Sequence, residues 1–172
     1  MPVLCKPPID PIVLATKLRL FIREQRDDGK PGWTVAVKRI LKKLADRKAY
    51  IVYPKPEWLL DVVWLHRKTG AIHLAVESEW GNKVEVLDDF QKLLCVKSPL
   101  KIMIYYAYHG SLVADFEEYM RSFDQHLEGE NYVLLEFAPG SQGPADSIHF
   151  YNVRKGNLSN GRLQSVKFEA LR

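Results

Sequence analysis

The chain has 172 residues, 47% of them hydrophobic, which is typical of one globular domain large enough to bury a core. Its formal charge of +4 and pI near 9.0 favour a polyanionic partner without excluding an ordinary enzyme. The two cysteines are isolated, which argues against a disulfide framework. There is no apolar run of about 18 residues to span a membrane, and the proline-rich N-terminus is unlike a signal peptide. We therefore expect a cytoplasmic protein without a membrane partner.

Two helices are predicted before the first strand. Asp10 and Pro11 are typical of a helix start, and apolar residues at helical spacing extend this helix over 10–26. Glu24, in its last turns, is expected to be either a solvated residue or a supporting acid for a site. Thr34 is expected to cap a second helix that continues to about Lys48.

The outer side of this second helix is predicted to be basic. Such a face is either simply solvated or in contact with nucleic-acid phosphates, where each cation would release counterions. The candidate nucleic-acid-binding residues are Lys38, Arg39, Lys42 and Lys43, followed by Arg47 and Lys48.

The stretch from Asp61 to Trp80, after a short strand at 50–53, predicts a hairpin with three carboxylates on otherwise apolar strands. Glu77 and Glu79 alternate onto the same face, with about 7 Å between their Cα atoms. Two adjacent acids on one face favour a bound cation. Ordinary salt bridges with Arg67 or Lys68 are the alternative.

The turn of this hairpin decides whether Asp61 joins the two glutamates. Residues 68–70 suit a three-residue loop with Gly70 at positive φ. This loop pairs Arg67 with Ala71 and places Asp61 opposite Glu77. A two-residue loop would turn Asp61 to the other face, because a one-residue slip reverses every side chain.

The remainder of the chain is predicted to complete a mixed sheet within a single domain, residues 1–172. A helix from Val86 to about Lys97 leads to a buried strand over 101–108, parallel to the strand of Glu77. A helix over 111–128 follows. The last strands, over 132–137, 148–153 and 163–171, are expected to form an antiparallel extension, with a loop at 138–144 and a turn at 155–157.

The order helix, strand, strand, strand, helix, strand, with Asp61 on the second strand and Glu-x-Glu on the third, resembles the PD-(D/E)XK nuclease superfamily. The resemblance covers about residues 34–108. It implies an α/β fold with a restriction-endonuclease-like αβββαβ core, to which the N-terminal helix and the segment 111–172 are additions. It also implies hydrolysis of DNA phosphodiester bonds.

The resemblance further implies that Asp61, Glu77 and the backbone carbonyl of Ser78 hold one or two Mg²⁺ or Mn²⁺ ions, since hard cations prefer oxygen ligands. Glu79 stands where most of the family has lysine, although some restriction endonucleases carry glutamate there. A glutamate could bind a second metal or take a proton from the attacking water. Lys92 is a candidate for the missing positive charge, and Gln91 is the alternative because helix phase does not choose between them.

These patterns lead to the hypothesis of a metal-dependent nuclease. The main alternative is a catalytically inactive nuclease-fold module that binds nucleic acid or a protein partner in a defence or repair complex. A second alternative is a purely structural subunit of such a complex. A homodimer would suit cleavage of two strands. Trp80 is expected either to pack in the core or to stack on a base.

Overall fold

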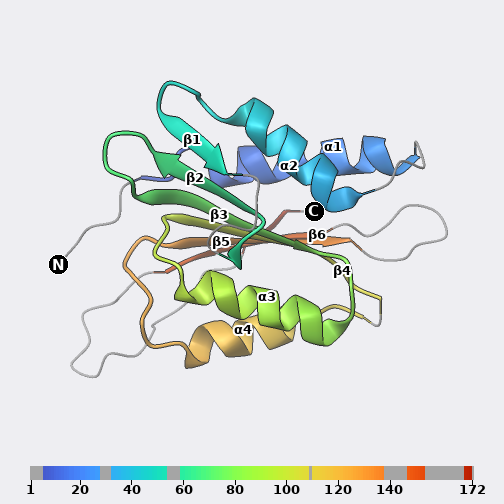
Figure 1. The fold of residues 1–172 in the computed structure, drawn as a ribbon. Helices are drawn as coiled ribbons and strands as arrows, with labels where there is room; N and C mark the ends of the chain where they lie inside the picture. Colours follow the sequence, from blue (N-terminus) through green and yellow to red (C-terminus); the bar gives the residue numbers. More distant parts are fainter. Residues whose placement is uncertain are drawn as a thin grey trace.

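The protein is a mixed α/β structure in which helices cover both faces of one sheet (Figure 1). The computed structural model describes residues 6–24, 32–53, 59–108, 110–137 and 147–153, and the backbone of 25–27 and 169–171. The predicted loop at 138–144, the predicted turn at 155–157 and the part of the last predicted strand before residue 169 lie outside these residues. The elements are α1 (Pro11–Asp27), α2 (Trp33–Leu44), β1 (Tyr50–Tyr53), β2 (Val62–His66), β3 (Ile72–Glu79), α3 (Lys83–Cys95), β4 (Leu100–Tyr106), α4 (Val113–Ser122), β5 (Asn131–Phe137), β6 (Ser147–Asn152) and β7 (Glu169–Leu171).

The described strands form one sheet in sequence order, from β1 to β7. The strands β1, β2 and β3 are antiparallel neighbours, β3, β4 and β5 are parallel, and β5, β6 and β7 are again antiparallel. The predicted antiparallel extension is therefore wrong for the strand at 132–137, which pairs parallel to β4 because α4 carries the chain back across the sheet. The helices α3 and α4 connect the parallel strands. The carboxyl ends of β3, β4 and β5 therefore meet at one edge of the sheet, which is where ligands bind in many sheets of this kind.

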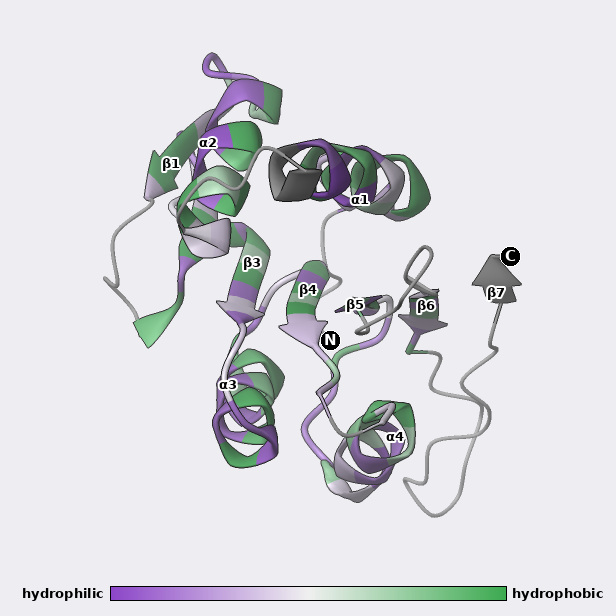
Figure 2. Cartoon of the chain, turned by 90° about the vertical axis from the view of Figure 1, so that its right-hand side faces the viewer, coloured by the Kyte–Doolittle hydropathy of each residue, from purple (hydrophilic) through white to green (hydrophobic). Residues whose placement is uncertain are grey.

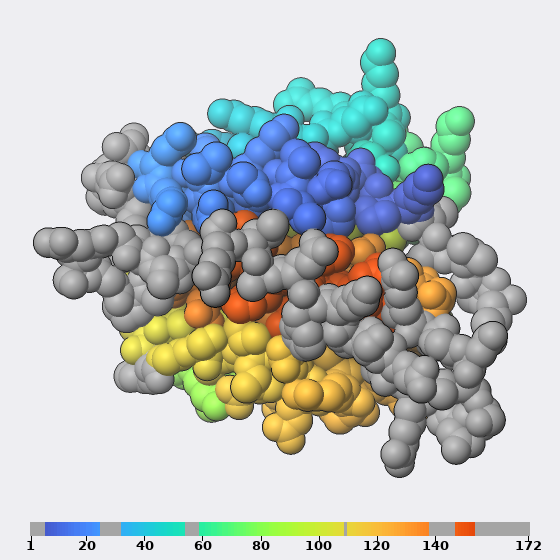
Figure 3. Space-filling view, turned by 180° about the vertical axis from the view of Figure 1, so that it is seen from behind, coloured from blue at the N-terminus to red at the C-terminus, as the bar shows by residue number. Residues whose placement is uncertain are grey.

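Figure 2 shows the sheet between α1 and α2 on one side and α3 and α4 on the other. Two clusters of buried hydrophobic side chains lie between the sheet and these helices, one on each face. Leu74 and Val76 of β3 face α1 and α2, whereas Ala75 between them faces α3. The strand β4 is buried along almost its whole length, as its apolar sequence predicts. From behind, the last strands lie between α1, in blue, and α4, in gold (Figure 3). No described helix has the length and apolarity needed to cross a membrane.

The helix α2 begins and ends differently from the prediction. Its N-cap is Gly32, with φ of 88°, and the Thr34 hydroxyl instead donates to the Ser78 carbonyl at 3.2 Å. The helix ends at Leu44 because Asp46 forms a turn: its carboxylate accepts the Lys48 N–H at 2.9 Å. The predicted extension to Lys48 is therefore wrong.

The helix α4 ends at Ser122, six residues before the predicted end at residue 128. The ring of His126 contacts the Met120 carbonyl through Nε2 at 2.8 Å, an acceptor that a continuing helix would offer to residue 124. The apolar spacing continues through Phe123, which still packs against the core. Periodicity alone therefore overestimated this helix.

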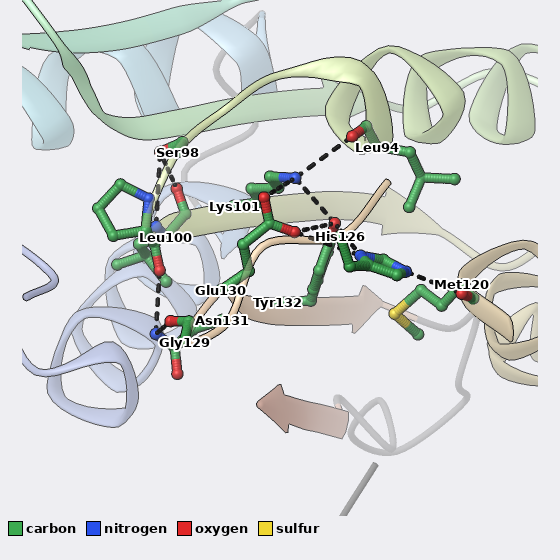
Figure 4. Close-up of polar contacts among 11 residues, drawn as sticks. Leu94, Ser98, Leu100, Lys101, Met120, His126, Gly129, Glu130, Asn131 and Tyr132 are labelled. Carbon is green, nitrogen blue, oxygen red and sulfur yellow. Dashed lines mark hydrogen bonds and ion pairs between the residues drawn. The ribbon is translucent and has the colours of Figure 1, made fainter. Parts of the chain in front are cut away.

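His126 belongs to a buried polar network between β4, β5 and the end of α4 (Figure 4). Lys101 donates to the Tyr132 hydroxyl at 2.8 Å and pairs with Glu130 at 3.1 Å. The other Glu130 oxygen lies 3.2 Å from His126 Nδ1. Burial lowers the pKa of Lys101, and the charge and hydrogen bond of Glu130 oppose this shift. The network joins two parallel strands to the segment after α4.

Breaking one side of this buried pair should destabilise the fold strongly. We expect Lys101→Met to lower the free energy of unfolding by about 3–5 kcal/mol, because Glu130 would keep a buried charge without its ammonium partner. The double variant Lys101→Met/Glu130→Gln should recover part of this loss. Urea denaturation measures both effects.

The exposed pair Arg121–Glu117 on α4 provides the control. Arg121→Gln should change the free energy of unfolding by less than about 1 kcal/mol. A similar small effect from Lys101→Met would show that the buried network contributes little.

Candidate functional site

The hairpin of β2 and β3 brings Asp61 opposite Glu77, as predicted, but through a different turn. The pairs Val62–Val76 and Trp64–Leu74 set the register next to the acids. At the turn, however, the His66 N–H donates to the Ala71 carbonyl, so the loop holds the four residues 67–70. The predicted pairing of Arg67 with Ala71 is therefore wrong.

A β-bulge compensates for the longer loop. Trp64 pairs with Leu74 and Leu65 with Ile72, which leaves His73 as the extra residue of β3. Without this bulge the four-residue loop would turn Asp61 away from Glu77. Gly70 has the predicted positive φ, 67°. The bulge at His73 thus determines which residues meet at the other end of the hairpin.

Asp61 and Glu77 are connected by two reciprocal hydrogen bonds. The Asp61 N–H donates to Glu77 Oε2 at 3.2 Å, and the Ser78 N–H donates to Asp61 Oδ2 at 3.0 Å. Each carboxylate therefore accepts a backbone N–H from the neighbouring segment. These contacts fix the positions of both side chains where the β2–β3 ladder ends.

Glu77 is almost completely buried, with 3% of its surface exposed. Its second oxygen, Oε1, is buried and has no hydrogen-bond partner among the described residues. Burial raises the pKa of Glu77 to about 8, with further increases from the charges of Asp89 and Asp61. Lys92 and the Asp61 N–H act in the opposite direction. The free protein therefore favours the protonated form of this carboxyl group near neutral pH.

The helix α3 supplies a further acid and a lysine. Its start is fixed by a capping box between Asn82 and Glu85. Asp89 and Lys92, three residues apart, form an ion pair on the side toward the sheet acids. The hydrogen bond to Asp89 raises the pKa of Lys92, and the charges of Glu77 and Asp61 add to this increase.

Gln91 and Lys92, the two alternatives left open by the sequence, are both exposed on α3, and Lys92 is electrostatically coupled to Glu77 and Asp61. Asp89 was not among the predicted site residues, although its spacing of three residues from Lys92 places the two side chains on one face of the helix.

The helix α2 contributes Lys38, whose Nζ lies 3.0 Å from Asp61 Oδ1. Lys38 was predicted to contact phosphates, and in the structure it pairs with an acid instead. Its predicted companions Arg39, Lys42 and Lys43 are exposed. Arg67, the alternative partner for the acids, donates through Nε to the Arg47 carbonyl at 2.8 Å.

Glu79 lies apart from the other two acids. Its Oε1 accepts the N–H groups of Trp80 at 2.8 Å and Gly81 at 2.6 Å, so it stabilises the connection between β3 and α3. Glu24 is exposed on α1. Within the described ranges, no three His, Cys, Asp or Glu side chains are grouped so as to hold a metal ion. The structure therefore brings together two of the three predicted carboxylates.

Comparisons of the chain with protein-family models, curated proteins and solved structures find no match.

The raised pKa of Glu77 predicts how stability depends on pH in metal-free buffer. Between the ordinary pKa of 4.5 and the folded value of about 8, the folded state holds a proton that the unfolded state has lost. The free energy of unfolding should therefore fall as pH rises through this window, by at most about 1.4 kcal/mol per pH unit from this group.

Glu77→Gln should remove this dependence. We expect its stability relative to wild type to increase between about pH 5 and pH 8, measured by urea denaturation in EDTA. Glu79→Gln, two residues along β3, serves as the control and should lack this trend. A constant difference between wild type and Glu77→Gln across this range would contradict the raised pKa.

Proposed function

We propose that this protein is a metal-dependent nuclease that hydrolyses DNA phosphodiester bonds, with Asp61 and Glu77 holding Mg²⁺ or Mn²⁺. The observation that carries the proposal is the buried, unpartnered Oε1 of Glu77 beside a second carboxylate. A buried polar atom without a partner is costly, and a hard divalent cation is a suitable partner for a carboxylate oxygen. The donor set therefore fits such a cation.

The order of elements supports the proposal at the level of the fold. The run α2, β1, β2, β3, α3, β4 has the order of a restriction-endonuclease-like core, with β3 and β4 parallel. Asp61 immediately precedes β2, and Glu77 lies on β3. We propose that this part of the chain, about residues 34–108, is such a core.

Each residue at the site has a separate role in this proposal. Asp61 and Glu77 hold the cation. The Ser78 carbonyl accepts a hydrogen bond from the Thr34 hydroxyl and has a second lone pair with which it can bind the cation. A bound divalent cation would lower the pKa of a water molecule and offset phosphate charge.

Lys92 places an ammonium group beside the acids, where it stabilises the charge that develops on the phosphate. Asp89 orients Lys92 through its ion pair. Glu79 stabilises the turn after β3. Most of the family has a lysine at position 79, and in this proposal Lys92 supplies the positive charge of that lysine. The exposed cations of α2, Arg39, Lys42 and Lys43, contact the phosphate backbone.

Removing either proposed metal ligand should abolish cleavage. We expect Asp61→Ala and Glu77→Ala to lower the rate of DNA cleavage in Mg²⁺ or Mn²⁺ by at least about 100-fold, because each removes an oxygen that positions the cation. A labelled-strand gel assay on single-stranded and duplex DNA measures the rate.

Asp88→Asn is the matched control, because Asp88 is an exposed acid on α3 next to Asp89. This variant should cut at the wild-type rate. Wild-type activity in the Asp61 and Glu77 variants would refute the nuclease assignment.

One observation favours a second candidate, an inactive module that binds nucleic acid or a protein partner. The ion pair between Lys38 and Asp61 neutralises the aspartate without any metal. If this pair is permanent, the Lys38 ammonium occupies the place of the metal cation at Asp61. If it is a resting contact, Lys38 competes with the metal and is released when metal binds.

The variant Lys38→Met separates these cases. For the nuclease we expect Mn²⁺ to bind wild type and to bind Lys38→Met roughly two- to fivefold more tightly, since a partly exposed ion pair no longer has to be broken. Isothermal titration calorimetry measures both affinities, with Arg39→Gln as the control for lost positive charge. If Mn²⁺ binds neither wild type nor Lys38→Met while DNA still binds, the result favours the inactive module over the nuclease.

A further inference from the structure

An aromatic pocket lies at the edge of the sheet where the parallel strands end. It has a volume of about 230 Å³ and is lined, among the described residues, by Trp33, Trp80, Tyr106, Tyr108 and Phe137. Tyr106 and Phe137 end β4 and β5, Trp80 directly follows β3, and Trp33 begins α2. Every one of these lining side chains carries an aromatic ring.

The rings form tilted walls rather than a closed stack. The centroids of Trp33 and Trp80 are 5.2 Å apart at 31°, and those of Trp80 and Phe137 are 5.7 Å apart at 45°. Tyr106 and Tyr108 contact each other at 4.5 Å. Tyr108 is 55% exposed, so part of its side chain reaches the surface at the pocket.

Hydrogen bonds connect this pocket to the acids. The Trp80 indole donates to the Ser78 hydroxyl at 2.9 Å, and the Ser78 N–H donates to Asp61. Trp80 follows Glu77 by three residues, about 10 Å along an extended chain. The pocket and the acids therefore lie at the same end of β3.

The size of the pocket limits what it can hold. Sites for complete drug-sized ligands occupy about 300–1,000 Å³, so 230 Å³ suits one planar ring system rather than a whole dinucleotide. Aromatic side chains stack on any base, and tyrosine hydroxyls can hydrogen-bond to a base edge. The exposed cations Arg39, Lys42 and Lys43 lie on α2, the helix that begins at Trp33, and supply partners for the phosphates.

We propose that this pocket binds an unpaired nucleobase of a DNA single strand while the phosphate backbone passes the Asp61–Glu77 site. The inference rests on the proposed nuclease function and gives its substrate class: DNA with a single-stranded segment. A base inside a duplex cannot enter the pocket, because its faces are covered by its neighbours. In this proposal, stacking of a base in the pocket makes the protein prefer single-stranded over duplex DNA. The Asp61–Glu77 site then cleaves the phosphate backbone of the bound strand.

Binding measured without metal tests this proposal separately from cleavage. The probes are fluorescent oligothymidylate of about 12 nucleotides, an abasic strand of equal length and a blunt duplex, in EDTA. We expect oligothymidylate to bind about 5- to 150-fold more tightly than the abasic strand, as one stacked base contributes about 1–3 kcal/mol. It should also bind more tightly than the duplex. Fluorescence anisotropy measures the affinities.

Two variants assign this preference to the pocket. Tyr108→Ala changes an exposed side chain and should reduce the preference for oligothymidylate over the abasic strand at least about fivefold, whereas Trp80→Phe should retain most of it. Val84→Ala, an exposed apolar residue of α3 outside the pocket, is the matched control and should change nothing. Arg39→Gln should weaken both single strands equally.

The outcomes distinguish this proposal from the nuclease assignment. Equal binding of oligothymidylate and the abasic strand, or an unchanged preference in Tyr108→Ala, would overturn the base pocket even if the protein cleaves DNA. A base-dependent preference that Tyr108→Ala removes would support the pocket even if no cleavage is found, in which case only the nuclease assignment fails.

Discussion

The candidate site depends on two hydrogen bonds that cross the end of the β2–β3 hairpin. Asp61 accepts the Ser78 N–H, and Glu77 accepts the Asp61 N–H. The backbone hydrogen bonds between β2 and β3 stop at this point, and the two carboxylates accept the next backbone N–H groups instead. Moving either carboxylate away would leave one of these N–H groups without a hydrogen-bond acceptor. Their positions are therefore set by the pairing of the strands, and the other features of the site are arranged around them.

The charges around these acids do not balance. Three carboxylates, those of Asp61, Glu77 and Asp89, face two ammonium groups, those of Lys38 and Lys92. One negative charge is left next to a hydrophobic layer, where it is costly. In the free protein a proton on Glu77 can remove it, which agrees with the raised pKa of this group. In the proposed nuclease a divalent cation takes the place of this proton.

Much of this arrangement was predictable from local patterns. The alternation of Glu77 with its apolar neighbours and the buried character of β4 follow from side-chain periodicity. The position of Asp61 opposite Glu77 was predicted correctly, but from a three-residue loop. The loop has four residues, and the one-residue shift in register that it causes is reversed by the bulge at His73. The network of Lys101 and Glu130 and the pairing of Lys38 with Asp61 depend on residues far apart in sequence, which periodicity cannot detect. Glu79 was grouped with Glu77 by spacing, but a nearby pair of N–H groups holds its carboxylate.

The most direct test of a cation site at these acids is anomalous diffraction from a crystal soaked in Mn²⁺. We expect an anomalous peak about 2.0–2.3 Å from Glu77 Oε1 and the Asp61 carboxylate, with the Lys38 ammonium displaced from Asp61. No peak at these oxygens at saturating Mn²⁺, with Lys38 still paired to Asp61, would contradict this expectation.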